Sequence, residues 1–240
     1  TKTGEVMAMV GQPSYNPNNR NNLKGEYYRN RTVTDVFEPG STLKPFTIAA
    51  ALESGQYLPS TTIDTRPGYF RVGGHIIRDI HDYGVIDVTT VIKKSSNVGA
   101  SKIALSLEPK ALWEILSKVG FGQPSGSAFP GESSGSLTSY NNWSEVEHAT
   151  IAFGYGLSMT TLQLAQAYAV LAAGGIMIPV SFTRVSDPAA GVRVISTSVA
   201  GQVRAMLETV VHDHGTGSRA AVRGYRVAGK TGTVHKSSAG

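Results

Sequence analysis

Hydrophobic residues recur at helical spacing most clearly over 159–173. Leu162, Ala165, Ala169 and Ala172 fall on one face there, as in a helix that buries one side against a core. The glycine pair that follows is typical of a helix end. The pattern predicts a helix across this stretch.

Four other stretches also predict helices. Residues 87–94 open with an acidic cap, 109–119 carry proline in the first turn, and 198–211 form a third segment of this kind. A Ser-Ser-Asn triplet follows the first of them and competes with helical hydrogen bonds. We therefore expect a break at the triplet, after which a helix resumes over 98–107.

Strands are predicted on both sides of this helical middle. Residues 69–72 and 75–78 flank a glycine pair, which indicates a two-residue hairpin. The other stretches with strand character are 5–10, 176–180, 182–185 and 224–234, whereas 12–22 and 122–142 read as loops. With no internal repeat, this order favours an α+β domain whose helices gather beside a sheet.

Composition narrows the class of protein. The 240 residues are 40% hydrophobic, which suits one or two globular domains, and the absence of cysteine excludes disulfides and thiolate metal sites. The net charge is +5, but Lys and Arg are scattered singly or in pairs, which favours a solvated basic surface over nucleic-acid binding. No apolar run approaches the roughly 20 residues that cross a bilayer.

Both ends of the chain read as cut. Each carries a predicted strand with no neighbouring segment to pair with, so we expect a fragment of a longer protein, truncated at both ends. We accordingly expect the isolated 240 residues to be poorly stable.

A candidate nucleophile lies in Glu-Pro-Gly-Ser-Thr-Leu-Lys-Pro at 38–45. A Pro-Gly pair breaks the preceding segment, and Pro45 is compatible only with the first turn of a helix, so this helix must begin close to Ser41. Ser41 and Lys44 are three residues apart and share a helix face. A serine hydroxyl becomes a strong nucleophile when a base takes its proton, and a lysine with a lowered pKa can be that base.

Two further motifs follow this Ser-x-x-Lys. Ser95 and Asn97 form a Ser-x-Asn triplet between two predicted helices, and 230–233 read Lys-Thr-Gly-Thr inside a predicted strand. Two other Ser-x-Asn triplets lie in loops, and a second Lys-Thr-Gly opens the first strand. One copy of each motif therefore remains as a candidate for the site: Ser41-x-x-Lys44, Ser95-x-Asn97 and Lys230-Thr-Gly-Thr233.

This ordered set is shared by serine β-lactamases and penicillin-binding proteins. Over its whole length the chain resembles the transpeptidase domain of class B penicillin-binding proteins, and among them the septal cell-division type. Beyond the three motifs, the resemblance is carried by 3–9, Pro17-Asn18, 38–45, Gly154-Tyr155-Gly156 and Gly215-Thr216-Gly217. It implies a penicillin-binding protein/serine β-lactamase-like α+β fold, in which an antiparallel sheet accompanies a large helical subdomain at roughly 41–175, with the C-terminal strands and helix missing from 1–240.

The resemblance also implies a peptidoglycan D,D-transpeptidase of the division septum that β-lactams inhibit. Ser41 would attack the penultimate D-Ala carbonyl of a stem peptide, and an amine on a neighbouring stem would take the acyl group. The catalytic residues would be Ser41, Lys44, Ser95, Asn97 and Lys230. Within this set Ser95 would relay a proton toward the leaving amine, and Asn97 would hold the substrate amide and Lys44.

Substrate binding is assigned by the same resemblance. Lys230 and its neighbours would receive the terminal carboxylate, and the backbone N–H groups of Ser41 and Thr233 would form an oxyanion hole. The residues expected to bind substrate are Thr231, Gly232, Thr233 and Tyr155. For Tyr155, a packing role is an equal alternative.

No cofactor or metal is implied, and His212-x-His214 reads as surface histidines at a helix end. The implied partners are peptidoglycan stem peptides, β-lactam antibiotics, the septal glycosyltransferase and other division proteins, and not nucleic acid. The implied location is the periplasmic face of the bacterial inner membrane, reached through an N-terminal anchor outside these residues.

Three alternatives stay open. A serine β-lactamase or β-lactam sensor shares the acylating parts, although no Glu is marked by its context as a deacylating base. A catalytically silent division scaffold would keep the fold as a binding module. The third alternative is a P-loop NTPase. A fourth motif, Gly224-x-x-x-x-Gly229-Lys230-Thr231, satisfies the phosphate-binding pattern, but the sequence around it lacks the required strand before and helix after.

Overall fold

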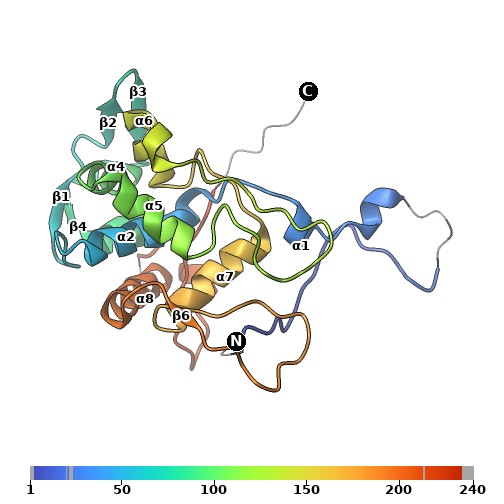
Figure 1. The fold of residues 1–240 in the computed structure, drawn as a ribbon. Helices are drawn as coiled ribbons and strands as arrows, with labels where there is room; N and C mark the ends of the chain where they lie inside the picture. The colour runs from blue at the N-terminus through green and yellow to red at the C-terminus, as the bar shows by residue number, and fades with distance from the viewer. Residues whose placement is uncertain (1–2, 20, 22–23, 213, 234–240) are drawn as a thin grey trace.

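Helices make up most of the regular structure. The computed structural model describes residues 3–19, 21, 24–212 and 214–233. Its α-helices are α1 (Arg31–Thr34), α2 (Lys44–Glu53), α3 (Val88–Lys94), α4 (Asn97–Leu105), α5 (Pro109–Lys118), α6 (Glu145–Ile151), α7 (Thr161–Ala172) and α8 (Thr197–Val211) (Figure 1). Short 3-10 helices are η1 (Gly25–Tyr28), η2 (Gly40–Leu43), η3 (Tyr140–Asn142) and η4 (Ser218–Ala220).

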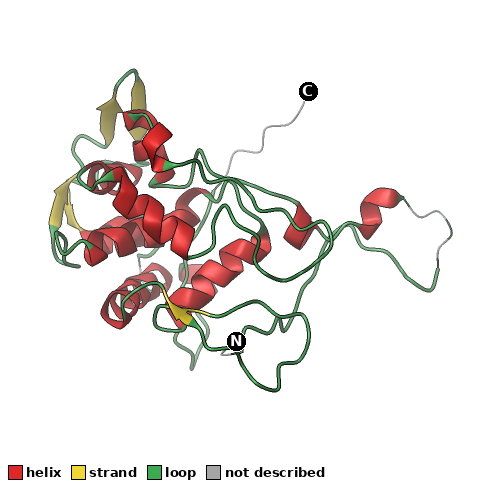
Figure 2. Cartoon of the chain, viewed as in Figure 1, coloured by secondary structure: helices red, strands yellow, loops and turns green. Residues whose placement is uncertain are grey.

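The strands form antiparallel pairs at the edges of the helical body (Figure 2). The pairs are β1 (Thr62–Asp64) with β4 (Val85–Asp87), β2 (Tyr69–Val72) with β3 (His75–Arg78), and β5 (Ile176–Met177) with β6 (Val192–Arg193). The predicted hairpin is confirmed, and Gly73 in its turn has a φ of +53°, a conformation that glycine adopts without strain. Helices accompanied by small antiparallel sheets match the expected α+β class.

Three predicted strands are wrong, and a fourth is shorter than expected. Residues 182–185 form bends and irregular backbone, and of 176–180 only Ile176–Met177 are a strand. In 5–10 only Glu5 makes a bridge, to Ser181, while Met7 and Val10 are about four-fifths exposed at 79% and 80%. The stretch 224–234 contains no strand as far as it is described, to residue 233. An apolar run becomes a strand only when a second strand satisfies its backbone, and none of the described strands pairs with any of these three stretches.

The core is built around α2, which is apolar on nearly all sides. Residues 44–52 are all buried, and the helix packs against α4, α5 and α8. The Phe46 ring meets the rings of Phe121 and Tyr168 edge to face, each at 5.5 Å between centroids. Because α2 is packed on several sides, the first turn of this helix is held in a fixed position.

The helix ends follow the cap signals of the sequence. Asp87 caps α3 through Thr90 N (2.7 Å), as predicted, and α4 begins at Asn97 after the expected break. Helix α6 was missed, although Ser144 and Glu147 form a complete capping box at its start. This signal predicts a helix a few residues after the loop at 122–142, and the structure has one there.

One side chain holds that loop against α7. Gln163 is fully buried, and its amide group donates to the backbone carbonyls of Gln123 (2.7 Å) and Ser134 (2.8 Å). Its oxygen accepts from Thr160 N (2.7 Å), which completes the cap of α7. The loop is thus anchored although it lacks regular structure of its own.

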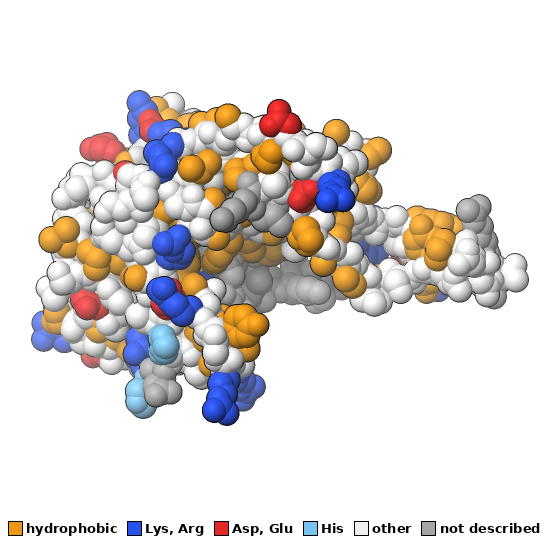
Figure 3. Space-filling model, turned by 90° about the horizontal axis from the view of Figure 1, so that it is seen from below, with side chains coloured by type: hydrophobic (Ala, Val, Ile, Leu, Met, Phe, Trp, Pro, Cys, Tyr) orange, Lys and Arg blue, Asp and Glu red, His pale blue; other side chains and the backbone are white. Residues whose placement is uncertain are grey.

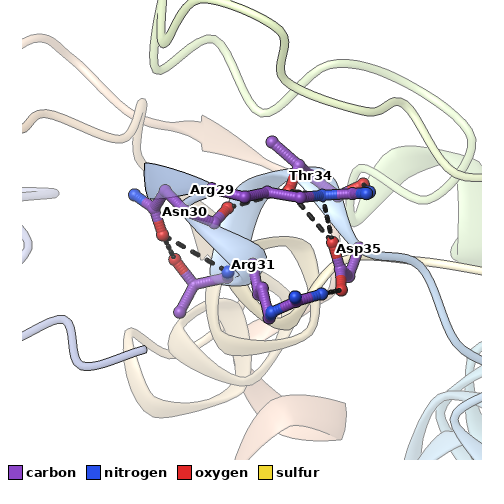
Figure 4. Close-up of polar contacts among 6 residues, drawn as sticks. Arg29, Asn30, Arg31, Thr34 and Asp35 are labelled. Carbon is purple, nitrogen blue, oxygen red and sulfur yellow. Dashed lines mark hydrogen bonds and ion pairs between the residues drawn. The ribbon is translucent and has the colours of Figure 1, made fainter. Parts of the chain in front are cut away.

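The segment before the nucleophile turn projects from the body as an arm (Figure 1). At its base, Asn30 caps α1, and Asp35 pairs with Arg29 (2.7 Å) and Arg31 (2.8 Å) (Figure 4). These ion pairs are partly exposed and contribute little each, on the order of 0–1 kcal/mol. They fix the direction in which the chain leaves the arm.

Charge is dispersed over the surface. On the face seen in Figure 3, Lys and Arg side chains occur singly or in small groups, separated by neutral and acidic side chains. No helix among the described residues is long and apolar enough to cross a membrane. Within the same residues, no group of three or more His, Cys, Asp or Glu side chains is placed to hold a metal ion.

Candidate active site

The Ser41 turn is a 3-10 helix that runs directly into α2. Gly40 precedes Ser41 with a φ of +56°, and Thr42 closes the turn by donating to Pro39 O (2.7 Å). The predicted helix start close to Ser41 is confirmed, since η2 spans Gly40–Leu43 and α2 begins at Lys44. Ser41 is partly exposed at the surface end of an otherwise buried helix.

Lys44 is the most unusual residue of the site because its side chain is 0% exposed. Its ammonium lies 3.1 Å from Ser41 Oγ, 3.1 Å from Ser95 Oγ and 2.7 Å from Asn97 Oδ1. It also donates to the backbone carbonyl of Ser95. One buried nitrogen therefore joins the candidate nucleophile to both polar residues of the Ser-x-Asn motif.

The surroundings of Lys44 favour its neutral form. Burial lowers the pKa of its ammonium well below the usual lysine value, and the nearby charge of Lys230 lowers it further, while Asp79 acts in the opposite direction. A neutral amine beside a serine hydroxyl can accept its proton. The geometry and the electrostatics both suit a general base.

Ser95 stands between two lysines. It adopts a left-handed backbone conformation with a φ of +61°, which ends α3 and turns its hydroxyl toward Lys44 and Lys230. Lys230 Nζ lies 2.8 Å from Ser95 Oγ, and burial lowers the pKa of Lys230 to about 8. A hydroxyl held between two amines is placed to pass a proton from one side to the other.

Asp79, which the sequence analysis missed, holds this triplet in position. It follows β3, and its carboxylate accepts from Ser96 Oγ (2.5 Å), Asn97 N (2.5 Å) and Val98 N (3.0 Å). Arg78, the residue before it, accepts from the Asn97 amide through its carbonyl (3.0 Å). The hairpin therefore positions the start of α4, where a carboxylate is favoured by the unpaired N–H groups.

The Lys-Thr-Gly-Thr segment lies against the nucleophile turn and has no regular secondary structure over 230–233. Gly232 lies so near the turn that a Cβ atom there would be 2.8 Å from Thr42 Cγ2. Thr231 Oγ1 lies 3.0 Å from Thr216 Oγ1, a second hydroxyl that sequence reasoning did not assign to the site. The segment's path is thus fixed by contacts with the turn and with the loop after α8.

These groups face one open cleft of about 660 Å³. Its lining includes Ser41, Ser95, Asn97, Tyr155, Thr231 and Thr233. Tyr155 lines the cleft and also packs edge to face on Phe153, with 5.5 Å between ring centroids, while its role in substrate binding stays a prediction. His214 also lines the cleft, and its carbonyl accepts from Lys94 Nζ (3.0 Å).

This constellation has counterparts in known proteins. The sequence model of a family described as the penicillin-binding protein transpeptidase domain matches residues 1–239. The chain belongs to this family. The penicillin-binding protein transpeptidase domain was the assignment expected from the three motifs, and the match covers them all.

Individual relatives agree with the family assignment. The chain is 45% identical over 234 residues to the Escherichia coli K12 peptidoglycan D,D-transpeptidase FtsI, covering 98% of this chain and 40% of that protein. It is also 45% identical over 238 residues to a Pseudomonas aeruginosa protein named as a probable peptidoglycan D,D-transpeptidase, PbpC, with coverages of 99% and 42%. The expected resemblance to the septal type is thereby confirmed.

A solved transpeptidase domain has the same fold. The apo structure of this domain from Burkholderia pseudomallei penicillin-binding protein 3 superposes with a TM-score of 0.88 at 43% identity, covering 98% of this chain and 67% of that one. The expected penicillin-binding protein fold is confirmed. The chain spans between 40% and 58% of the length of the first curated relatives it matches.

Proposed function

We propose that this chain is the acylating domain of a peptidoglycan D,D-transpeptidase and that Ser41 is its nucleophile. The observation that carries the proposal is the fully buried Lys44 amine, 3.1 Å from Ser41 Oγ and hydrogen-bonded to Ser95 and Asn97. In its neutral form Lys44 takes the Ser41 proton as Oγ attacks the penultimate D-Ala carbonyl carbon of a stem peptide. The C–N bond to the terminal D-Ala then breaks and leaves a Ser41 ester.

The leaving amine needs a proton, and Ser95 is placed to supply it. Its hydroxyl is within hydrogen-bond distance of both Lys44 (3.1 Å) and Lys230 (2.8 Å). The proton taken from Ser41 returns through Ser95 to the departing nitrogen, so Lys44 is regenerated. An amine of a second stem then attacks the ester and releases Ser41, which forms the cross-link.

The terminal carboxylate of the donor stem is received by Lys230, Thr231 and Thr233 at the cleft wall. A protonated ammonium and two hydroxyls are the donors that a carboxylate requires. The backbone N–H groups of Ser41 and Thr233 complete the site as the oxyanion hole, where each donor is typically worth about 3 kcal/mol in the transition state. Tyr155 and Asn97 border the peptide, and Gly232 lets the segment that binds the carboxylate lie against the nucleophile turn at Thr42.

The direct test is mass spectrometry of the intact protein mixed with a penicillin. We expect a long-lived adduct of the penicillin mass that maps to Ser41 and is absent from Ser41→Ala. Rapid release of free penicilloate would instead indicate a β-lactamase. Absence of any adduct would favour a silent scaffold. Saturable ATP binding lost in Lys230→Ala would favour a P-loop protein.

Acylation is also expected to depend on pH in a bell shape. Lys44 acts when neutral, so the rate rises as pH increases through its lowered pKa. Lys230 acts when protonated, so the rate falls as pH passes its pKa of about 8. Because guanidinium stays charged throughout, Lys230→Arg should move the alkaline limb to higher pH, as followed by stopped-flow acylation with a chromogenic cephalosporin. A wild-type rate that is constant from about pH 7 to 9.5 would contradict this assignment.

The whole protein is proposed to act in septal peptidoglycan synthesis, on the strength of its relatives' names. Its partners would be peptidoglycan stem peptides, a septal glycosyltransferase and other division proteins, and its location the periplasmic face of the inner membrane. β-Lactam antibiotics would inhibit it through Ser41. Depletion of the intact protein should therefore block division, so that cells elongate without forming septa.

A further inference from the structure

A glycine outside the three motifs lies directly behind the nucleophile turn. Gly154 ends α6 in the left-handed region, with a φ of +91°, and its N–H donates to Ile151 O (3.0 Å). The next N–H, of Tyr155, donates to Thr150 O (3.2 Å), which is the hydrogen-bond pattern of a glycine-terminated helix. This local role alone explains why a glycine stands there.

The contact with Gly40 goes beyond that local role. The Gly154 carbonyl accepts from Gly40 N (3.1 Å), so the two backbones are joined. A Cβ atom at Gly154 would lie 2.0 Å from Gly40 O and 2.5 Å from Gly40 N. Both residues are buried, and the atoms met are main chain, so neither side has room to give way.

The peptide group touched by Gly154 is the one that precedes the nucleophile. The Gly40 carbonyl and the Ser41 N–H belong to the same planar unit, so displacement of that oxygen also rotates the N–H. On another side, a Cβ atom at Gly40 would lie 2.7 Å from Thr233 O. Gly40 is therefore enclosed between Gly154 and Thr233, the residue that carries the second candidate oxyanion donor.

We propose that Gly154 is a positioning residue for the reaction, which sets the orientation of the Ser41 N–H and its spacing from Thr233 through direct backbone contact with Gly40. The inference rests on the proposed function, because it concerns the oxyanion hole of that same site. Gly154 itself touches neither substrate nor the reacting atoms. Its effect on the reaction is transmitted through the Gly40–Ser41 peptide.

Helix α7 offers a matched control. Gly174 ends it with the same pattern, since its N–H donates to Leu171 O (3.3 Å) and that of Gly175 donates to Val170 O (2.8 Å). The φ of Gly174 is +67°, and a Cβ atom there would meet nothing within 4 Å. Alanine at either glycine causes similar helix-end strain, but only at Gly154 does it collide with the nucleophile turn.

The experiment compares penicillin acylation of the intact protein with that of Gly154→Ala, Gly154→Asn and Gly174→Ala. Stopped-flow measurements over a range of penicillin concentrations separate the acylation rate constant from the dissociation constant of the preceding non-covalent complex. We expect the rate constant of both Gly154 variants to fall about 100-fold, the typical loss of an oxyanion donor, with the dissociation constant changed less than about threefold. Gly174→Ala should acylate like the wild type.

Asparagine tolerates positive φ better than alanine, which keeps the test decisive if Gly154→Ala folds poorly. Acylation of Gly154→Asn at the wild-type rate would show that backbone strain alone matters and would overturn the proposal. The collision should also lower the thermal unfolding midpoints of the Gly154 variants below that of Gly174→Ala, since Gly174 has open space around it. Gly154 variants whose dissociation constant for penicillin rises as much as their acylation rate constant falls would also overturn the proposal, because the whole site would then be disturbed. Failure of the wild type to form an adduct would count against the proposed function, independently of these ratios.

Discussion

Lys44→Met is expected to slow penicillin acylation of Ser41 by about 10³-fold or more, within the usual range for loss of a general base. Methionine has a similar length and suits a site that is 0% exposed, but it cannot accept a proton. The neutral amine 3.1 Å from Ser41 Oγ is the base that this change removes. The measurement is the second-order acylation rate from a gel or stopped-flow assay with a fluorescent penicillin.

Two further variants identify what Lys44 contributes. Lys44→Arg retains the positive charge, but a guanidinium stays protonated, so we expect it to be as slow as Lys44→Met. Recovery of the rate with arginine would show that Lys44 acts as a fixed charge and not as a base. Lys93→Met, on the neighbouring helix α3, is the control for loss of a lysine and should retain the wild-type rate.

Asp79→Ala is expected to lower the free energy of unfolding by about 3 kcal/mol and the acylation rate by about 100-fold. The change leaves three donors without their acceptor, namely Ser96 Oγ and the N–H groups of Asn97 and Val98. Displacement of the triplet then moves Ser95 and Asn97 away from Lys44, and misplacement of about 1 Å commonly costs 10²-fold. Denaturant titration and acylation kinetics of the intact protein check the two effects.

The control for Asp79 is Asp82, an exposed residue of the following loop whose carboxylate accepts from Gly84 N (2.8 Å). Asp82→Ala should change stability by less than about 1 kcal/mol and leave the acylation rate unchanged. Asp79→Asn, which keeps one acceptor oxygen, is expected to fall between wild type and alanine on both measures. Equal acylation rates for Asp79→Ala and Asp82→Ala would rule out a positioning role for Asp79.

The contact at the centre of the candidate site could be predicted because its two residues are close in sequence. Ser41 and Lys44 share one turn, so their spacing alone indicated a contact, and the structure gives it as 3.1 Å. Asp79 gave no such signal, because it lies 17 residues before Ser96 and reaches it only through the folding of a hairpin. Thr216 and Gly154 belong to stretches that carry the family resemblance, but no role could be assigned to them from the sequence, since their partners are distant along the chain.

Helices were predicted far better than strands, for a related physical reason. The cap at Asp87 and the proline that opens α5 act within one turn, so they can be recognised without knowledge of the fold. The missed helix α6 carried a legible Ser144-x-x-Glu147 signal that was overlooked. The stretches 5–10 and 224–234 have strand-like sequences, but a strand depends on a neighbour that no local pattern specifies.

The Gln163 anchor has a consequence for how this protein can vary. Its two acceptors in the long loop, Gln123 O and Ser134 O, are main-chain atoms. These hydrogen bonds therefore depend on the path of the loop backbone and not on the loop side chains. Natural variants can therefore diversify at these two loop positions while the loop keeps its place. Gln163 itself cannot be replaced in the same way, because Gln163→Glu would place a carboxylate against two carbonyl oxygens. Sequence drift should accordingly be high in the loop and nearly absent at the residue that holds it.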